Sequence, residues 1–259
     1  MRRVAICCLL AACGRLNFDD RVDDDGGDAH VIPGLCMPNA TAPDPLTISG
    51  TTFRYMSFDN SQRTPLASVT VSALDENGTQ VAVATSDAMA RYTLSIQTGG
   101  AAPRLVLAYA LIGSFDTRVT IDRPVDRNIT GANMAVWTVG DGPVWDQATM
   151  NQFYAAAGTT RLATRGTLNI AIRDCADQPI PNVTIDIAPA PELVLYQSDD
   201  GMLVSSGSTL GRFATAFALN AVPGPTTITA TADGYTFAPL GVMVYQDQAN
   251  TLAIAHADP

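Results

Sequence analysis

The sequence predicts an all-β protein: two tandem β-sandwich domains joined by a short helix, after a disordered N-terminal tether. Three observations predict this fold class. From about residue 46 onwards, short stretches alternate apolar and polar residues between turn residues, which is typical of half-buried antiparallel strands. One such stretch, at residue 65, recurs at residue 179. An acidic segment with paired glycines precedes them and lacks the apolar surface needed to fold.

The composition narrows the chemistry available to the chain. Its 259 residues suffice for one large domain or two ordinary ones. All basic residues are arginine, so Schiff-base and P-loop lysine chemistry is excluded. The formal net charge of −10 disfavours nucleic acid as a partner, because phosphates would be repelled. The two histidines, His30 and His256, offer almost nothing for a triad or a zinc site, so we expect no cofactor, no metal and no enzyme activity.

The N-terminus has the pattern of an export signal. Arg2 and Arg3 precede an uncharged run over residues 4–12, which is far shorter than the ~20 apolar residues needed to span a membrane. The run ends in Leu10-Ala11-Ala12-Cys13, which resembles the lipobox of bacterial lipoproteins. The resemblance implies that residues 1–12 are removed as a lipoprotein signal peptide and that Cys13 is lipidated, which makes the membrane a partner. The alternative is a buried strand with an unrelated cysteine.

Residues 13–45 are predicted to form a lipid-anchored acidic tether. Six aspartates lie close together and repel one another: Asp19, Asp20, Asp23, Asp24, Asp25 and Asp28. A calcium loop of the EF-hand type is not supported, because Arg21 stands where a carboxylate is required. We therefore expect an exported protein that is lipid-anchored in the bacterial cell envelope. Gly14, in place of an aspartate after Cys13, favours the outer membrane.

Residues 46–141 are predicted to form the first β-sandwich. Residues 69–73, 81–84 and 92–96 alternate apolar and polar side chains. Asn77-Gly78 lies between the first two of these stretches and predicts a tight hairpin, since both residues tolerate positive φ.

The second β-sandwich is predicted over residues 164–259, where the pattern recurs. Residues 65–71 (PLASVTV) align with residues 179–185 (PIPNVTI). Downstream, residues 86–92 (SDAMARY) align with residues 208–213 (STLGRF), where an aromatic residue is expected to open a strand. A single recurrence at this spacing indicates a duplicated domain rather than a solenoid.

The second copy resembles the carboxypeptidase regulatory-like family, whose domains are transthyretin-like, Ig-like β-sandwiches of seven strands. The resemblance rests on RDCADQPIPNVTI (residues 173–185) and GPTTITATADGYTF (residues 224–237). The family has a glycine before the proline, where this chain has Gln178, and the first copy lacks a clear closing motif over residues 98–124. Short motifs dominated by turns imply a fold rather than an activity.

Residues 142–163 are predicted to form a helical linker. Side chains recur on one face at helical spacing, namely Trp145, Thr149, Met150, Phe153 and Tyr154. We expect Pro143 in the first turn, Asp146 at the N-terminal end and Gly158 after the last turn. The aromatic residues are expected to pack against a domain, and an exposed aromatic platform is the alternative.

Two cysteines remain once Cys13 is lipidated and the signal peptide is removed. They are Cys36, near the end of the tether, and Cys175, in the second domain. An even pair in an exported chain favours a disulfide, and two independent thiols are the alternative. A disulfide requires the two Cα atoms to approach to ~6 Å, so both alternatives stay open.

These observations favour a non-enzymatic cell-envelope lipoprotein that displays two β-sandwich modules for binding or structural scaffolding. Its expected partners are the membrane, through the lipid on Cys13, and an envelope protein or polysaccharide. A carbohydrate-binding module is the first alternative, with Tyr235 and Phe237 as its compact aromatic candidates, although the family motif places such aromatics in the core. An unrecognised hydrolase is the second alternative, since carboxylates are numerous but none lies in a recognisable motif.

Overall fold

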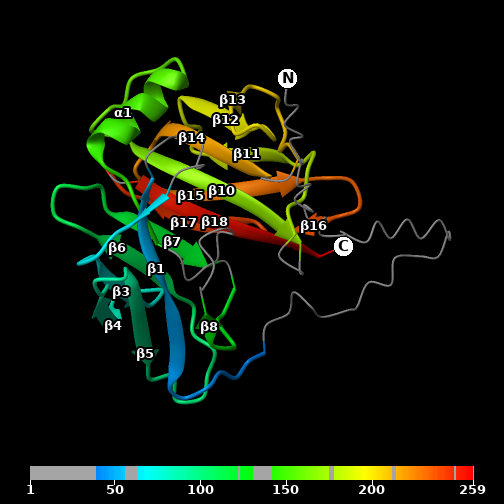
Figure 1. Cartoon of the computed structure of the whole chain (residues 1–259). Helices are drawn as coiled ribbons and strands as arrows, with labels where there is room; N and C mark the ends of the chain where they lie inside the picture. Colours follow the sequence, from blue (N-terminus) through cyan, green and yellow to red (C-terminus); the bar gives the residue numbers. More distant parts are fainter. Residues whose placement is uncertain are drawn as a thin grey trace, which may run out of the picture. The chain divides into compact units, whose positions relative to one another are not determined.

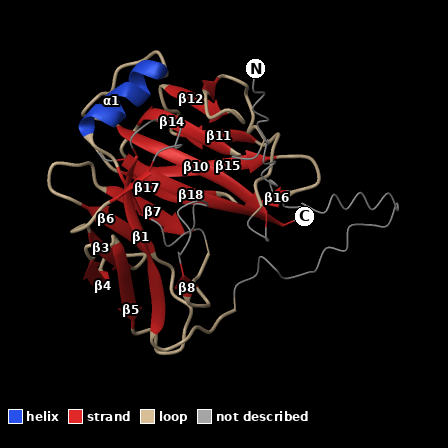
Figure 2. Ribbon diagram, in the orientation of Figure 1, coloured by secondary structure: helices blue, strands red, loops and turns tan. Residues whose placement is uncertain are grey.

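A computed structural model of the chain describes residues 39–55, 63–121, 123–130, 142–174, 178–211, 214–247 and 249–258. Within these residues the chain forms strands β1 to β18 and one short helix, α1 (Figures 1 and 2). The sheets pack face to face around apolar cores. The predicted all-β sandwich fold with one short helix is therefore confirmed.

The first half of the described chain forms two facing sheets. Its strands are β1 (Leu46–Tyr55), β2 (Arg63–Pro65), β3 (Thr70–Leu74), β4 (Gln80–Thr85), β5 (Arg91–Ile96), β6 (Val106–Ala110), β7 (Thr117–Ile121), β8 (Ile129–Thr130) and β9 (Gly142–Val144). β1 pairs with β5 and β2 in antiparallel fashion and with β8 and β9 in parallel. The facing sheet has the order β7-β6-β3-β4. The three alternating stretches of the sequence thus become β3, β4 and β5, as predicted.

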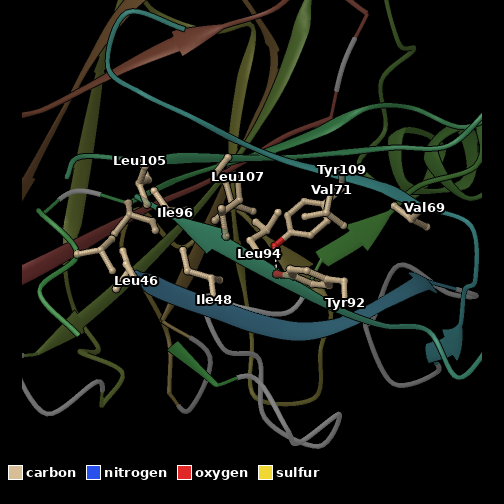
Figure 3. Close-up of a cluster of buried hydrophobic side chains, with 14 of the residues drawn as sticks. Leu46, Ile48, Val69, Val71, Tyr92, Leu94, Ile96, Leu105, Leu107 and Tyr109 are labelled. Carbon is tan, nitrogen blue, oxygen red and sulfur yellow. Dashed lines mark hydrogen bonds between the residues drawn. The ribbon is translucent and has the colours of Figure 1, made fainter. Parts of the chain in front are cut away.

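Alternate residues of the two sheets fill the first core. In β5, Tyr92, Leu94 and Ile96 are buried and the residues between them are exposed. Tyr109 on β6 is also buried, and its hydroxyl oxygen lies 3.0 Å from the hydroxyl oxygen of Tyr92 (Figure 3). Because the two phenols hydrogen-bond to each other, both polar atoms enter the core with a partner.

The hairpin between β3 and β4 turns where the sequence predicts it. The Asp75 carboxylate accepts hydrogen bonds from the backbone N–H groups of Asn77 (2.9 Å) and Thr79 (2.8 Å). Gly78 has a φ of 80°, in the left-handed region that favours glycine. The side chain of Asp75 therefore replaces backbone partners that the tight turn leaves unpaired.

The second half of the described chain forms the helix and a second sandwich. Helix α1 (Gln147–Ala156) comes first and is followed by β10 (Gly166–Asp174), β11 (Thr184–Ala188), β12 (Leu193–Gln197), β13 (Leu203–Val204), β14 (Thr215–Ala221), β15 (Gly224–Thr231), β16 (Thr236–Phe237), β17 (Leu240–Val244) and β18 (Ala249–Asp258). One sheet contains the order β13-β12-β14-β10-β18, and the other is β11-β15-β17. Side chains from both sheets, among them Ile170, Ile185 and Val242, meet in the second core.

The two sandwiches repeat each other strand by strand. Strands β1, β3, β5, β6, β7 and β8 correspond to β10, β11, β14, β15, β17 and β18, with matching partners and directions. β3 spans residues 70–74 and β11 spans residues 184–188, an offset of 114 at both ends. The alignment of residues 65–71 with residues 179–185 is therefore confirmed.

A buried hydroxyl forms hydrogen bonds to the backbone of the connection that precedes β3. The Ser86 Oγ donates to the Leu66 carbonyl (3.0 Å) and accepts from the Val69 N–H (3.0 Å). Ser68 between them has a φ of 63°, so the chain turns sharply there. The side chain of Ser86 is buried, and both of its bonds go to backbone groups, of which the Leu66 carbonyl also accepts from the Thr52 hydroxyl.

The second copy builds the same cluster before β11. The Thr209 Oγ1 donates to the Ile180 carbonyl (2.9 Å) and accepts from the Val183 N–H (2.9 Å). Asn182 has a φ of 62°, matching Ser68. The partner of Ser86 is therefore Thr209, one residue later than the sequence alignment placed it.

Phe213, where the motif predicts the start of a strand, lies outside the described residues, and β14 begins at Thr215. In the first copy the N–H of Thr52 donates to the carbonyl of Ala90, and in the second the N–H of Ile172 donates to the carbonyl of Ala214. The connection in the second copy is therefore one residue longer, whereas the motif alignment of seven residues with six makes it one residue shorter.

One strand changes sheet between the copies. β4 pairs with β3, whereas β12, in the corresponding place, pairs with β14. Leu195 of β12 packs with Phe217 and Leu219 of β14 in a third core, which also contains residues of α1. The helix therefore supplies apolar contacts that hold β12 beside β14.

Helix α1 packs on a sandwich instead of standing apart as a connector. Met150, Phe153 and Tyr154 are buried in the third core, which confirms the expected packing and overturns the alternative of an exposed aromatic platform. All seven residues of β14 are buried, because the second core covers one of its faces and the third core covers the other.

The helix starts later than the sequence predicts. The Asp146 carboxylate caps it by accepting the Thr149 N–H at 2.7 Å, as its predicted place at the N-terminal end requires. Pro143 lies in β9 opposite Phe53 of β1, and Trp145 bridges Phe115. The prediction that Pro143 belongs to the first turn is wrong, because strand pairing extends the chain up to the cap.

The C-terminal strand belongs to both halves of the molecule. One edge of β18 pairs in parallel with β10, from Thr167–Ala249 to Asp174–Ala257, and the other pairs in parallel with β7, from Thr117–Ala249 to Ile121–Ile254. β18 lies between β10 and β7 in Figure 1. One continuous sheet therefore runs from β13 through β18 to β4. The predicted domain boundaries stay predictions.

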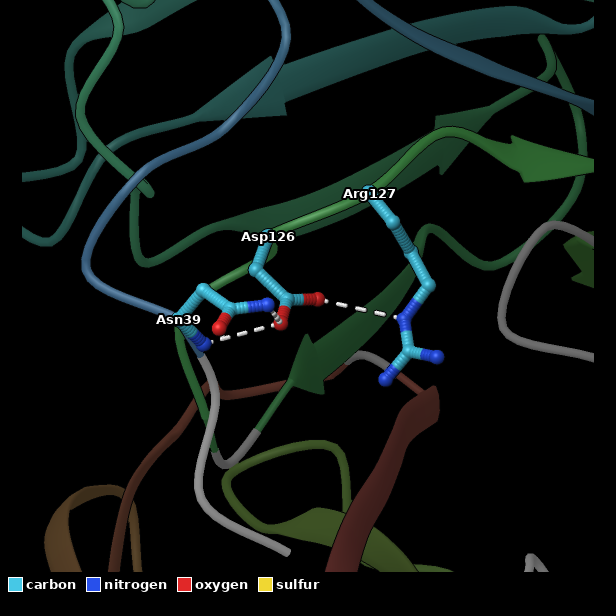
Figure 4. Close-up of polar contacts among 3 residues, drawn as sticks. All are labelled: Asn39, Asp126 and Arg127. Atoms are coloured by element: carbon cyan, nitrogen blue, oxygen red, sulfur yellow. Dashed lines mark hydrogen bonds and ion pairs between the residues drawn. The ribbon is translucent and has the colours of Figure 1, made fainter. Parts of the chain in front are cut away.

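The first residues described are bound to the first sandwich. The Asp126 carboxylate accepts from the backbone N–H (2.8 Å) and the side-chain amide (3.0 Å) of Asn39 and pairs with Arg127 (Figure 4). Burial opposes ionisation, but the Asn39 N–H and the Arg127 charge together lower the pKa of Asp126. Residues 39–45, which the sequence assigns to the tether, thus have fixed contacts, as the bond from Ala42 N–H to the Gly100 carbonyl also shows.

Candidate functional site

The three cysteines singled out in the sequence lie outside the described residues. Cys13 and Cys36 precede residue 39, and Cys175 falls between residues 174 and 178. Lipidation of Cys13 and a bond between Cys36 and Cys175 therefore stay predictions.

A pocket of about 340 Å³ lies where the two sandwiches meet. Four stretches of the sequence line it: the tip of the β3–β4 hairpin (residues 74–78), residues 104–106 at the start of β6, residues 120–121 at the end of β7, and residues 240–243 of β17 with Tyr245. We call this pocket the β17 groove. Its volume lies within the ~300–1,000 Å³ of small-ligand sites.

The β17 groove has an apolar floor and a charged rim. Leu105, Ile121 and Leu240 are buried at its floor, whereas Glu76 and Arg104 are exposed at its rim. Its walls come from four segments that only the fold brings together, so the groove has no continuous pattern in the sequence. The single local signal is Pro225 in β15, since a proline within a strand marks an irregular or edge position.

The aromatic pair of the sequence analysis is partly exposed. Tyr235 is 36% exposed, and its ring centroid lies 6.3 Å from that of Phe237, which packs partly against the second core. The expectation that both rings face inward is therefore wrong for Tyr235. It lies directly after the Asp233-Gly234 turn and bridges Ala232 across that turn.

A polar network centred on the buried Asn220 ties the segment after α1 to the second sandwich. The Asn220 side chain accepts from the Leu162 N–H (3.0 Å) and donates to the Glu192 carboxylate (2.8 Å), although Asn220 is only 2% exposed. The Thr159 hydroxyl donates to the same carboxylate at 2.6 Å. These bonds from Thr159 and Asn220 lower the pKa of Glu192. The network is structural, since every polar group named here has a partner.

Within the described ranges, no group of three or more His, Cys, Asp or Glu side chains could hold a metal ion. In the same part of the chain, no helix is long and apolar enough to cross a membrane.

The sequence matches no protein-family model and no curated protein. Among solved structures, it is similar to the TIE protein of Bacillus anthracis, with 14% identity, a TM-score of 0.26, and coverage of 82% of this chain and 34% of that one. The shaft pilin SpaA of Lactobacillus rhamnosus GG gives 12% identity, a TM-score of 0.24, and coverage of 82% and 99%. The pilus backbone protein RrgB of Streptococcus pneumoniae gives 8%, 0.25, and coverage of 84% and 66%. The chain thus spans about a third of the TIE protein, and likenesses at these TM-scores carry no conclusion about its function.

Proposed function

We propose that the chain is a non-enzymatic lipoprotein of the bacterial cell envelope whose two β-sandwiches form one rigid element for display or scaffolding. The observation that carries the proposal is the double pairing of β18. A strand hydrogen-bonded to β10 on one edge and to β7 on the other couples the two sandwiches through backbone bonds. A scaffold needs such coupling, because it has to hold binding surfaces at a fixed spacing.

The third core supports the same proposal. Phe53 of the first sandwich is fully buried together with Phe153 of α1 and Phe217 of β14. The ring centroids of Phe153 and Phe217 lie 5.0 Å apart. Burial of large aromatic side chains from both halves resists bending at the junction. A flexible connection would leave these rings in water.

The proposed location in the cell envelope rests on the sequence. The run that ends in Leu10-Ala11-Ala12-Cys13 supports export and lipidation, and the acidic segment after it would keep the sandwiches away from the membrane surface. An envelope position, with the outer membrane favoured, completes the proposal.

Fractionation of cells that express Cys13→Ser tests the anchor. We expect the wild-type chain and the control Cys175→Ser in the membrane fraction, and Cys13→Ser in the soluble fraction. A Cys13→Ser chain that stays with the membrane would overturn the lipid anchor. Crosslinking on intact cells then tests scaffolding, since a display element should be captured together with a neighbouring envelope component.

Exposure of Tyr235 supports a second candidate, carbohydrate binding. Exposed aromatic rings are the usual platforms for sugars, and Tyr235 and Phe237 lie side by side. The test is pulldown with insoluble peptidoglycan and cellulose. Retention of the wild-type chain together with loss of Tyr235→Ala would support this candidate, and equal behaviour of the two chains would reject it.

A further inference from the structure

We infer that the β17 groove binds an extended peptide segment of a partner protein, with apolar residues at alternate positions, which adds to the sheet beside β17. The inference deepens the proposed display role and rests on it, because it names the class of partner. Four structural observations carry it: the edge that the groove exposes, the direction of the backbone groups there, the corresponding edge in the first sandwich, and the availability of other strands.

The groove follows the edge of β17 and not one of its faces. Leu240, Gly241, Val242 and Met243 line it in succession. Successive side chains of a strand point to opposite faces, so a cavity that touches four consecutive residues must lie along the strand's side. Among the described residues, β17 pairs with β15 alone.

The backbone of β17 offers hydrogen-bonding groups to the groove. Pro225 of β15 lies opposite Met243 and has no N–H, so this pair is assigned as non-hydrogen-bonded. Hydrogen-bonded and non-hydrogen-bonded pairs alternate along an antiparallel ladder. Gly241, two residues from Met243, therefore also belongs to a non-hydrogen-bonded pair, with Thr227. The N–H and C=O groups of Gly241 and Met243 therefore point away from β15, towards the groove.

A hydrogen bond in the first sandwich independently indicates the same alternation of hydrogen-bonded and non-hydrogen-bonded pairs. Ile121 N–H donates to the Leu105 carbonyl at 3.3 Å, so the next pair, Val106 and Thr120, is the non-hydrogen-bonded one. In the duplication, Thr120 corresponds to Gly241, because Val106–Thr120 matches Thr227–Gly241.

The corresponding edge in the first sandwich already holds a strand. Thr120 lies opposite Ala253 of β18, which pairs in parallel with β7. The chain therefore shows that this type of edge accepts an extended segment. Main-chain pairing of this kind supplies affinity, and side-chain pockets along the groove supply specificity.

A partner protein fits the groove better than a second copy does. The one strand known to pair with this type of edge, β18, is engaged on both of its edges. The chain also carries a net charge of −10, which disfavours self-association through acidic segments and favours an uncharged or basic peptide.

The test uses the full chain in detergent and a synthetic probe, Arg-Thr-Val-Thr-Val-Thr-Val. Hydrogen exchange of the amides of Gly241 and Met243 should slow when the probe binds, while exchange at Val242, which already pairs with β15, should not change. The probe should bind with a Kd below about 1 mM. Unchanged exchange at both Gly241 and Met243 would overturn the inference.

Matched variants separate edge pairing from a general effect. Met243→Pro removes the N–H that faces the groove and should weaken binding at least about tenfold, whereas Met243→Ala keeps it and should bind like the wild-type chain. If Met243→Pro does not fold, probes that are N-methylated on the valines or on the threonines decide the question. One of the two should lose binding, because only alternate amides face β17.

Besides unchanged exchange at Gly241 and Met243, three further results would overturn the inference. The first is equal binding of both N-methylated probes, and the second is equal binding by Met243→Pro and Met243→Ala. The third is protection of Gly241 and Met243 that rises with chain concentration in the absence of probe, which would assign the groove to a second copy. None of these results bears on the fractionation of Cys13→Ser, so failure of the peptide site and failure of the lipid anchor are distinguishable.

Discussion

Ser86 and Thr209 make the same pair of hydrogen bonds in two different sandwiches. Each hydroxyl donates to a carbonyl and accepts the N–H three residues further on, and the two sets of backbone partners are Leu66 with Val69 and Ile180 with Val183. The duplication has therefore retained a polar cluster as well as a strand order. Buried hydroxyls of this kind are costly to lose, since each loss removes a hydrogen-bond partner from buried backbone groups.

Thr209→Val should lower the free energy of unfolding by about 1–3 kcal/mol, because the isosteric side chain leaves the Ile180 carbonyl and the Val183 N–H unpaired. Denaturant titration of the full chain measures the change. Thr227→Val is the control, since Thr227 is exposed on β15 and its substitution should stay within about 0.5 kcal/mol. Equal effects of both substitutions would contradict the role assigned to the Thr209 hydroxyl.

Ile254→Pro should uncouple the two sandwiches. It removes one N–H from a strand that is paired on both edges, at a cost of about 3 kcal/mol. We expect the wild-type chain to unfold in one calorimetric transition and Ile254→Pro in two. Ile254→Val keeps the N–H and should preserve the single transition. Two transitions in the wild-type chain would show that β18 does not couple the sandwiches.

Asp146→Ala should destabilise the chain by about 1 kcal/mol, because the first turn of α1 loses its cap. The bond to the Thr149 N–H measures 2.7 Å, and Arg54 lies 3.8 Å from the same carboxylate. Asp146→Asn retains the capping oxygen and should cost less. If asparagine and alanine had the same effect in denaturant titrations, the Arg54 charge would outweigh the cap.

Acid should weaken the network around Glu192. Hydrogen bonds from Thr159 and Asn220 lower the pKa of this carboxyl below its value in the unfolded chain. Its contribution to stability is therefore complete above the unfolded pKa and is lost as the pH falls through the folded one. Glu192→Gln should be less stable than the wild-type chain at neutral pH, and the difference should shrink in acid. Denaturant titrations across this range measure it, and a difference that is independent of pH would contradict the prediction.

Cys36 and Cys175 should be bonded in the exported chain. Before reduction, neither thiol should react with iodoacetamide, and after reduction both should. The reason is the even pair in an oxidising compartment. A bond would tie the segment just before Asn39, which is held by Asp126, to the end of β10. Labelling of both thiols without reduction would establish the alternative of independent thiols.

Local patterns in the sequence were enough to predict several of the strands. Alternation predicted β3, β4 and β5, Asn77-Gly78 predicted their hairpin, and the recurrence at residue 179 predicted the copy of β3 at β11. Each of these features depends on neighbours within a few residues, because strand periodicity and turn geometry are local properties. The same patterns failed between Thr209 and Ala214, where the connection is one residue longer than the connection between Ser86 and Ala90.

Only the tertiary structure decided which strands pair with one another in each sheet. β4 and β12 occupy corresponding places, yet they pair with different sheets, and Leu193 and Leu195 of β12 pack in the core that contains residues of α1. Nothing local marks β18 as the strand that joins both halves, since its pairing depends on the edges of β7 and β10, which lie far from it in the sequence. The β17 groove arises in the same way. The sequence by itself thus determined the elements, their duplication and the export signal to be tested, whereas long-range edge pairing and helix packing decided the junction and the groove.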